Sequence, residues 1–153
     1  MNTWERVGEI FQGNQSAVEL MKIVKVISHV WDDLVDGEAV SLNQLNSAFW
    51  LALVGLRRNE FYREHYALLD PILDGACLNY VASIVLEKGT EQQREIAHNA
   101  RYAVGDIALT IAGIIGGYAW AAKHSAELKA MSNTDTMAHF KAEMNERHGH
   151  AAH

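Results

Sequence analysis

The sequence contains very few residues of two types that constrain a fold. Cys77 is the only cysteine and Pro71 the only proline among 153 residues. A single thiol excludes an intrachain disulfide framework and a metal cage built from cysteines, and it suits a reducing cytoplasm. One proline and long runs without turn signals leave little room for a β-sandwich. These absences favour a helical cytoplasmic protein.

Positive charge is scarce as well. The chain has 13 Lys and Arg against 19 Asp and Glu, a formal net charge of −6. An acidic protein repels phosphate backbones unless it carries a local basic patch. The nearest candidate, Arg57-Arg58, is offset within two turns by Glu60 and Glu64. We therefore expect no nucleic-acid partner.

One segment, Ile107 to Ala122, is uncharged for about 16 residues, whereas a membrane span needs roughly 20. It includes Gly113 and Gly117, which would allow close neighbours in a buried helix. A buried central helix is the simpler interpretation, and a short membrane segment is the alternative. The N-terminal residues include Glu5 and Glu9 and no apolar run, so no signal peptide is expected.

Helical periodicity and capping signals predict an all-α fold, a single-domain bundle of about five to seven helices. The first three expected helices cover about 1–12, 17–36 and 42–56, and the third continues as a polar helix over 57–66. A fourth covers about 71–88, a long apolar central helix covers about 91–125, and a short last helix follows. Their boundary signals are Gly37, Ser41, Asp70-Pro71 and the capping box Thr90-Glu91-Gln92-Gln93. The domain is expected over residues 1–140. Residues 141–153, with His148, His150 and His153, are expected to form a flexible tail.

The most chemically distinctive segment is the acidic helix end His29-Val-Trp-Asp32-Asp33-Leu-Val-Asp36-Gly37-Glu38. On a helical wheel six residues fall within an arc of roughly 100°: Lys22, Lys25, His29, Asp32, Asp33 and Asp36. The rest of the helix is almost wholly apolar, so this polar seam lies on a helix that is packed on most sides. Acids near a helix C-terminus oppose the helix dipole, and a structural role alone would favour lysine there.

Clustered carboxylates raise one another's pKa unless a cation neutralises them. The spacing of Asp32, Asp33 and Asp36 lets several carboxylates approach one site, which suits Mg²⁺, an ion that prefers oxygen ligands. His29, one turn earlier, and Asp106, beside the apolar run, are the candidate catalytic residues. This hypothesis needs Asp106 to lie opposite the acids of the first helix. The simpler alternative is that the seam faces water.

The sequence Asp32-Asp33-Leu-Val-Asp36-Gly37 resembles the first aspartate-rich motif of class I isoprenoid synthases, in the squalene and phytoene synthase branch. About 80 residues later, Ile111-Ala112-Gly113-Ile114-Ile115-Gly116 is similar to a small-residue stretch on a later core helix of that branch. The resemblance implies that the aspartates hold Mg²⁺ against a substrate diphosphate. No second aspartate-rich motif follows, and the chain is about half the family's length.

A second resemblance joins two segments, ISHVWDDLVDGE and NSAFWLALVGLRRNEFY. Together they are similar to small helical proteins of unassigned function that tailed bacteriophages encode. This resemblance implies an accessory protein in the host cytoplasm or associated with the virion, and it implies no particular chemistry.

Three classes of function remain open. The first is a soluble, non-enzymatic interaction or accessory protein with a protein partner or a second copy of itself. The second is a Mg²⁺-dependent enzyme or binding protein for a phosphorylated small molecule, using Asp32, Asp33 and Asp36. The third is a membrane-active protein that inserts residues 107–122. The first class has the most support, because charged seams usually face solvent and the second aspartate-rich motif is missing.

Overall fold

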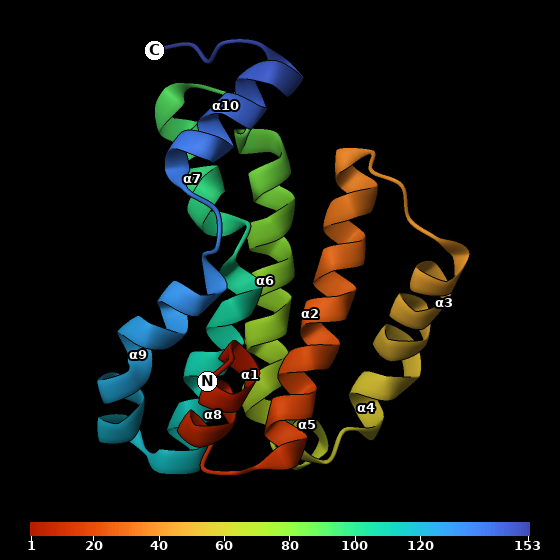
Figure 1. Ribbon diagram of the computed structural model, residues 1–153, viewed down its shortest axis with the longest axis vertical. Coiled ribbons are helices and arrows are strands. Elements are labelled where there is room, and N and C mark those ends of the chain that lie inside the picture. Colours follow the sequence, from red (N-terminus) through yellow and green to blue (C-terminus); the bar gives the residue numbers. More distant parts are fainter.

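The computed structural model describes residues 1–153 and contains helices but no strands, which confirms the predicted all-α class. The helices are α1 (Thr3–Ile10), α2 (Gln15–Asp36), α3 (Leu42–Trp50), the π-helix η1 (Leu51–Gly55), α4 (Leu56–Arg58), α5 (Glu60–Glu64), α6 (Tyr66–Leu86), α7 (Glu91–Ala100), the 3₁₀-helix η2 (Ala103–Asp106), α8 (Ile107–Gly116), α9 (Tyr118–Ser132) and α10 (Met137–His148). In Figure 1, α2 and α6 stand upright side by side, and α10 covers the upper end.

Several capping signals in the sequence act where they are predicted. Ser41 and Thr90 each accept a hydrogen bond from a backbone N–H one turn into the helix, completing capping boxes with Gln44 and Gln93. Gly37 closes α2 with a left-handed φ of 73°, which glycine adopts without strain. Local side-chain chemistry therefore determines these three boundaries.

The predicted start of a helix at Asp70-Pro71 is wrong. Helix α6 already begins at Tyr66, and Pro71 lies inside it. Asp70 accepts a hydrogen bond from the Tyr62 hydroxyl at 2.9 Å instead of capping a helix. Pro71 leaves the Ala67 carbonyl without its helical donor, but Ala67 is exposed, so water can satisfy that carbonyl.

The predicted continuous helix at about 91–125 is also wrong, because the structure divides it among α7, η2, α8 and α9. Gly117 separates α8 from α9 with a φ of 85°. Gly105 lies in η2 against α9, where a Cβ atom would collide with Ser132. These breaks let α9 turn back along α8, and the Trp120 indole donates a hydrogen bond to the Ile10 carbonyl at 2.9 Å. The long apolar helix of the fold is α6.

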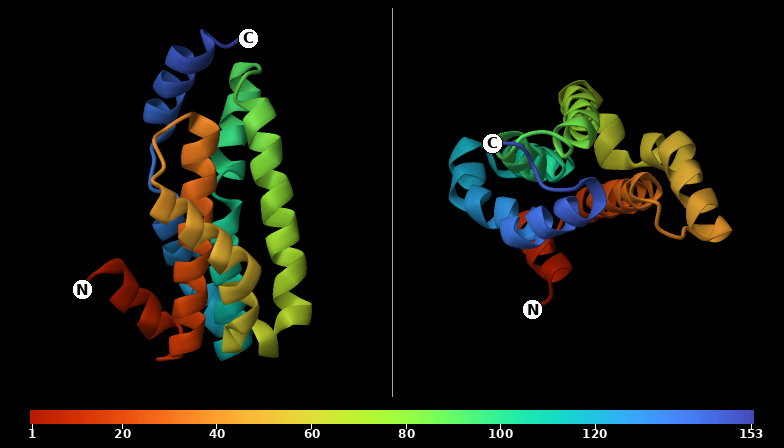
Figure 2. Two further views of the ribbon diagram at one scale, coloured as in Figure 1. Left: turned by 90° about the vertical axis from the view of Figure 1, so that its right-hand side faces the viewer. Right: turned by 90° about the horizontal axis from the view of Figure 1, so that it is seen from above.

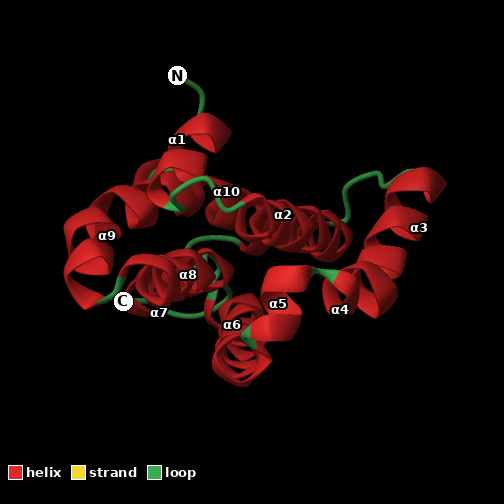
Figure 3. Cartoon of the chain, turned by 90° about the horizontal axis from the view of Figure 1, so that it is seen from below, coloured by secondary structure: helices red, strands yellow, loops and turns green.

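The main core lies in the lower part of the bundle, where α1, α2, α5, α6, α8 and α9 meet (Figure 3). Its fully buried large side chains include Phe11, Leu20, Phe61, Leu69 and Ile111. A second, smaller cluster at the upper end consists of Ala97, Phe140 and Met144. The apolar core is therefore concentrated at one end of the molecule.

The segment α3–η1–α4 forms an arm beside α2, and in Figures 1 and 2 it lies at the edge of the molecule. Ala48 and Gly55 are its buried residues, whereas Phe49 and Trp50 are exposed. Gly55 closes the π-helix in a place where a Cβ atom would lie about 3 Å from Trp50 and Leu51 side-chain atoms. The arm thus covers one side of α2 and presents its other side to solvent.

The proposed membrane segment 107–122 does not form one helix. At 1.5 Å per residue, the ten residues of α8 span about 15 Å, roughly half a bilayer's hydrocarbon core. By length and composition, α6 is the one helix that could cross a membrane, and 17% of its apolar window is buried in the structure. Asp70 and Asp74 lie within α6, and both would carry charge into such a span.

Candidate functional site

The acidic helix end lies where the top of α2 approaches α6, the α7–η2 turn and α10 (Figure 1). The last turn of α2 contains no basic residue. The N–H groups of Gly37 and Glu38 donate to the carbonyls of Leu34 and Asp33, which satisfies the helix end. The carboxylates of this turn must therefore find compensation from other elements.

Asp32 is compensated by two residues from distant parts of the chain. The Tyr80 hydroxyl on α6 donates to Asp32 Oδ1 at 2.7 Å, and Arg101 Nη2 lies 3.3 Å from Asp32 Oδ2. Burial, followed by the hydrogen bond to this carboxylate, raises the pKa of Tyr80 well above its usual range. Tyr80 therefore remains a neutral donor to Asp32.

Asp36 is the most buried carboxylate of the acidic end, with a side chain that is 7% exposed. Arg147 Nη1 on α10 donates to Asp36 Oδ1 at 2.8 Å, and Arg101 Nη2 lies 4.0 Å from Asp36 Oδ2. Burial and then the neighbouring Asp32 raise the pKa of Asp36 to about 6, and the two arginines only partly oppose this shift.

Arg101 connects both carboxylates and is itself only 12% exposed. Its guanidinium lies 5.3 Å from the ring centre of Phe140 and 5.7 Å from that of Tyr102, within cation–π range. Burial alone would lower the pKa of Arg101, but Asp32, Tyr102 and Asp36 together raise it. Arg101 is therefore charged, although its buried Nη1 has no hydrogen-bond partner.

These five residues form what we call the polar layer: Asp32, Asp36, Tyr80, Arg101 and Arg147. They come from α2, α6, the end of α7 and α10, so the layer joins four parts of the chain. The arginines supply the positive charge that the sequence hypothesis assigned to Mg²⁺. Asp33 is partly exposed, and its carboxylate makes no hydrogen bond or ion pair.

The two predicted catalytic residues do not join the polar layer. His29 is exposed and makes no polar side-chain contact. Asp106 Oδ1 accepts a hydrogen bond from Lys129 Nζ of α9 at 2.6 Å, and no residue of α2 contacts its carboxylate. Asp106 therefore does not lie opposite Asp32 and Asp36 as expected, because its carboxylate pairs with Lys129 of α9.

One group of three potential metal ligands does converge within 4.8 Å, and sequence reasoning missed it: Asp135, His139 and Glu143. Their i, i+4, i+8 spacing was the available signal. His139 Nδ1 lies 2.6 Å from Asp135 Oδ1, while Glu143 is bound by Arg147 at 2.8 Å. His139 is 69% exposed, so existing ion pairs and solvent account for this group.

The expected flexible tail begins in the middle of a helix, since residues 141–148 complete α10 and Met144 is fully buried. Arg94, only 2% exposed, anchors this segment. Its guanidinium donates to the Asn145 side chain at 2.7 Å and to the carbonyls of Gly149 at 2.8 Å and Glu87 at 2.7 Å.

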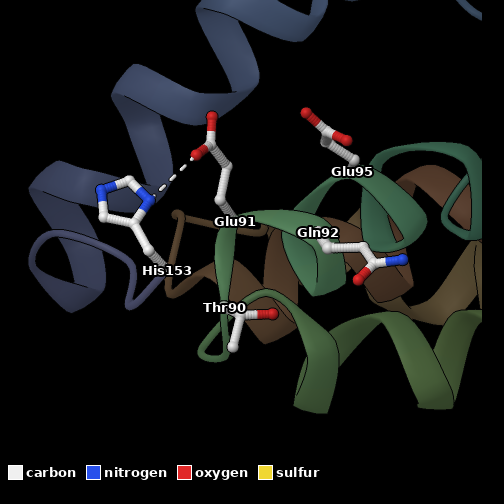
Figure 4. Close-up of a pocket in the computed structure, with 5 residues that line it drawn as sticks. All are labelled: Thr90, Glu91, Gln92, Glu95 and His153. Atoms are coloured by element: carbon white, nitrogen blue, oxygen red, sulfur yellow. Dashed lines mark ion pairs between the residues drawn. The ribbon is translucent and has the colours of Figure 1, made fainter.

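The last residues lie against the start of α7. The Glu91 N–H donates to the Ala152 carbonyl at 2.9 Å, and His153 Nδ1 lies 3.2 Å from Glu91 Oε2. Figure 4 shows this ion pair at the rim of a surface hollow, which no hydrophobic side chain lines. Such a lining lacks the apolar walls typical of small-molecule pockets.

No protein-family model, curated protein or solved structure matches this chain. The resemblances to the synthase motif and to phage proteins therefore stay predictions.

Proposed function

We propose that this chain is a non-enzymatic helical protein that works by packing exposed apolar helix faces against another protein chain. The observation that carries the proposal is the amount of large apolar side chain that the fold leaves in solvent, concentrated on the arm and on α6. Monomeric proteins rarely expose continuous apolar patches beyond a few hundred Å².

The arm contributes the first of these faces. Leu42, Phe49, Trp50 and Leu53 are between 53% and 70% exposed, although each is large and apolar. Leu42, Phe49 and Leu53 follow one another by seven and four residues, which places them on one side of the helical arm. An amphipathic helix of this kind suits a partner that offers an apolar groove or another helix.

Helix α6 contributes the second face, with Leu78, Val81 and Val85 between 48% and 70% exposed. The candidate catalytic residues offer less support for an enzyme. Two of the three aspartates contact arginines, and the remaining candidates, His29 and Asp106, lie outside the polar layer. A cytoplasmic location suits this proposal, because the single cysteine of the sequence is compatible with a reducing compartment.

The experiment is chemical crosslinking in the cells that make the protein, followed by purification of the wild type and two charged variants. Phe49→Arg/Leu53→Arg alters the arm, and Leu78→Arg/Val85→Arg alters α6. We expect a crosslinked species, with this chain or another as partner, that at least one variant loses. The control is Tyr118→Arg, because Tyr118 is 89% exposed and lies on neither face.

The proposal fails if every species that wild type forms is retained by both charged variants. Circular dichroism of each purified variant shows whether it remains helical, so loss of a species through unfolding is recognised.

A further inference from the structure

The solvent-facing side of α6 has a regular composition of its own. Opposite its buried residues Leu69, Ala76 and Ser83, the helix presents a second line of residues to solvent. We call this line the outer face of α6: Ala67, Pro71, Asp74, Leu78, Val81, Val85 and, just beyond the helix, Lys88. Leu78, Val81 and Val85 are 63%, 48% and 70% exposed. In views along the long axis, α6 lies at the edge of the molecule (Figures 2 and 3).

The spacing of the outer face is that of a coiled-coil seam. Successive members are separated by four, three, four, three, four and three residues, which averages the 3.5-residue repeat of packed helix pairs. Any line of residues along one side of an α-helix has this spacing, so the composition of its centre is what distinguishes the outer face: the centre of a helix face that serves only as solvent-exposed surface would be polar. The centre of this face is instead Leu78, Val81 and Val85, so it fits another helix lying along it.

The surface area of the chain is large enough to accommodate such an interface. Its accessible surface is 8904 Å², whereas a monomer of 17.0 kDa is expected to expose about 7,700 Å². The difference, about 1,200 Å², exceeds the roughly 800 Å² that each partner contributes to a standard protein interface. Covering the outer face of α6 and its neighbours would bring the exposed surface to an ordinary value.

The charges on the outer face indicate which partner covers it. Asp74 lies before the apolar centre and Lys88 after it; both are exposed, and neither makes an ion pair within the chain. Their separation of 14 residues corresponds to about 21 Å along a helix. A second copy running antiparallel would bring its Lys88 near Asp74 at both ends of the contact. A parallel copy would place Asp74 beside Asp74.

We propose that a second copy of this chain packs antiparallel against the outer face of α6, with Leu78, Val81 and Val85 at the centre of a twofold interface. This inference rests on the proposed function and specifies its partner. The ion pair between Asp74 of one copy and Lys88 of the other, formed at each end, sets the direction of the helices. The apolar centre supplies the affinity.

The first test is the mass of the purified protein in solution, measured by light scattering and by sedimentation over a concentration series. We expect wild type at twice the mass of one chain, and Leu78→Arg/Val85→Arg at the mass of one chain, with dissociation at least about 100-fold easier. The matched control is Ile96→Arg/Tyr118→Arg, which alters two exposed apolar residues of α7 and α9 and should leave the dimer intact.

The second test concerns direction. Asp74→Lys alone and Lys88→Asp alone should each weaken the dimer about 3- to 10-fold at low salt. The double variant Asp74→Lys/Lys88→Asp should restore wild-type affinity, because an antiparallel pair regains opposite charges at both ends. A parallel pair would already oppose like charges in wild type, so neither single variant would weaken it. Single variants that dimerise as tightly as wild type, or a double variant that is not rescued, would overturn the antiparallel arrangement.

The outcomes separate this inference from the proposed function. Wild type could form a dimer that Phe49→Arg/Leu53→Arg dissociates but Leu78→Arg/Val85→Arg leaves intact. That result would overturn the α6 interface and leave the proposed function standing. The same conclusion would follow if wild type were a monomer at every concentration but were crosslinked in cells to a different protein, and one of the charged variants lost that crosslink. Sedimentation of wild type with phosphatidylcholine vesicles, lost in Leu78→Arg/Val85→Arg, would instead assign the face to a membrane.

Discussion

The lower and upper ends of this bundle are held together by different forces. At the lower end, Phe11, Phe61, Leu69 and Ile111 pack in a continuous apolar core. At the upper end the apolar cluster has three buried residues, and arginines bound to carboxylates and carbonyls make most of the contacts between helices. Apolar burial is non-directional and insensitive to pH, whereas ion pairs depend on geometry and protonation. The two ends should therefore respond differently to mutation and to solution conditions.

The largest effect is expected from the lower core. Ile111→Ala removes a fully buried side chain and should lower the free energy of unfolding by about 2–5 kcal/mol. Urea denaturation at a fixed protein concentration measures this change. Leu42→Ala, at a position 70% exposed, should change stability by less than about 0.5 kcal/mol. Equal effects of the two variants would contradict the assignment of the core.

A smaller and more local effect is expected from the anchor of α10. Arg94→Met leaves three oxygen acceptors without their donor and should cost about 2–3 kcal/mol. Hydrogen exchange should accelerate in residues 137–152 and remain slow in α8. Arg94→Lys keeps the charge but cannot span three acceptors, so it should show a milder form of the same pattern. Uniform acceleration across the chain would mean that the two ends unfold as one unit.

The smallest effect is expected from the polar layer, and it depends on pH. The pKa of Asp36 is raised to about 6, so between about pH 4 and 6 the folded chain keeps a proton that the unfolded chain has released. The contribution of Asp36 to the stability of wild type should therefore fall as pH rises through this window and level off above it. Asp36→Asn lacks this step, and it should gain about 1–2 kcal/mol relative to wild type between pH 4 and 7.

Thermal denaturation across this pH range measures the difference between wild type and Asp36→Asn. The control is Asp33→Asn, which changes a neighbouring acid that has no ion pair and should keep the wild-type slope. The assignment of Asp36 fails if Asp36→Asn and wild type lose stability in parallel.

The features of this fold that are encoded locally could be predicted from the sequence. Gly37, Ser41 and Thr90 act within one turn of their own positions, and each marks a helix end as predicted. Pro71 misled because a proline is tolerated inside a helix when the carbonyl it leaves free is exposed. Gly117 breaks the predicted central helix with a left-handed φ of 85°, and Gly105 lies against Ser132 of α9, a contact that a local pattern does not reveal.

The candidate site could be located but its chemistry could not be deduced. The position of Asp32 and Asp36 on a mostly buried helix was readable from the wheel. Their partners Arg101 and Arg147 lie 69 and 111 residues further along the chain, so only the tertiary fold reveals that arginines neutralise these acids. Arg94 lies 51 residues from Asn145 and 55 from Gly149, so the way it anchors α10 is likewise visible only in the tertiary fold.

The π-helix Leu51–Gly55 in the arm has a consequence for how this protein tolerates change in its length. A π-turn closes its hydrogen bonds over five residues instead of four, so it holds one residue more than an α-turn. Deleting exposed Ala52 would remove that extra residue and convert the turn to ordinary α-helix, with Leu42 and Phe49 keeping their direction relative to Arg57. A single-codon deletion at this position would thus leave the exposed face of the arm in place, whereas the same deletion within a regular α-helix would rotate one half of the helix by about 100° relative to the other.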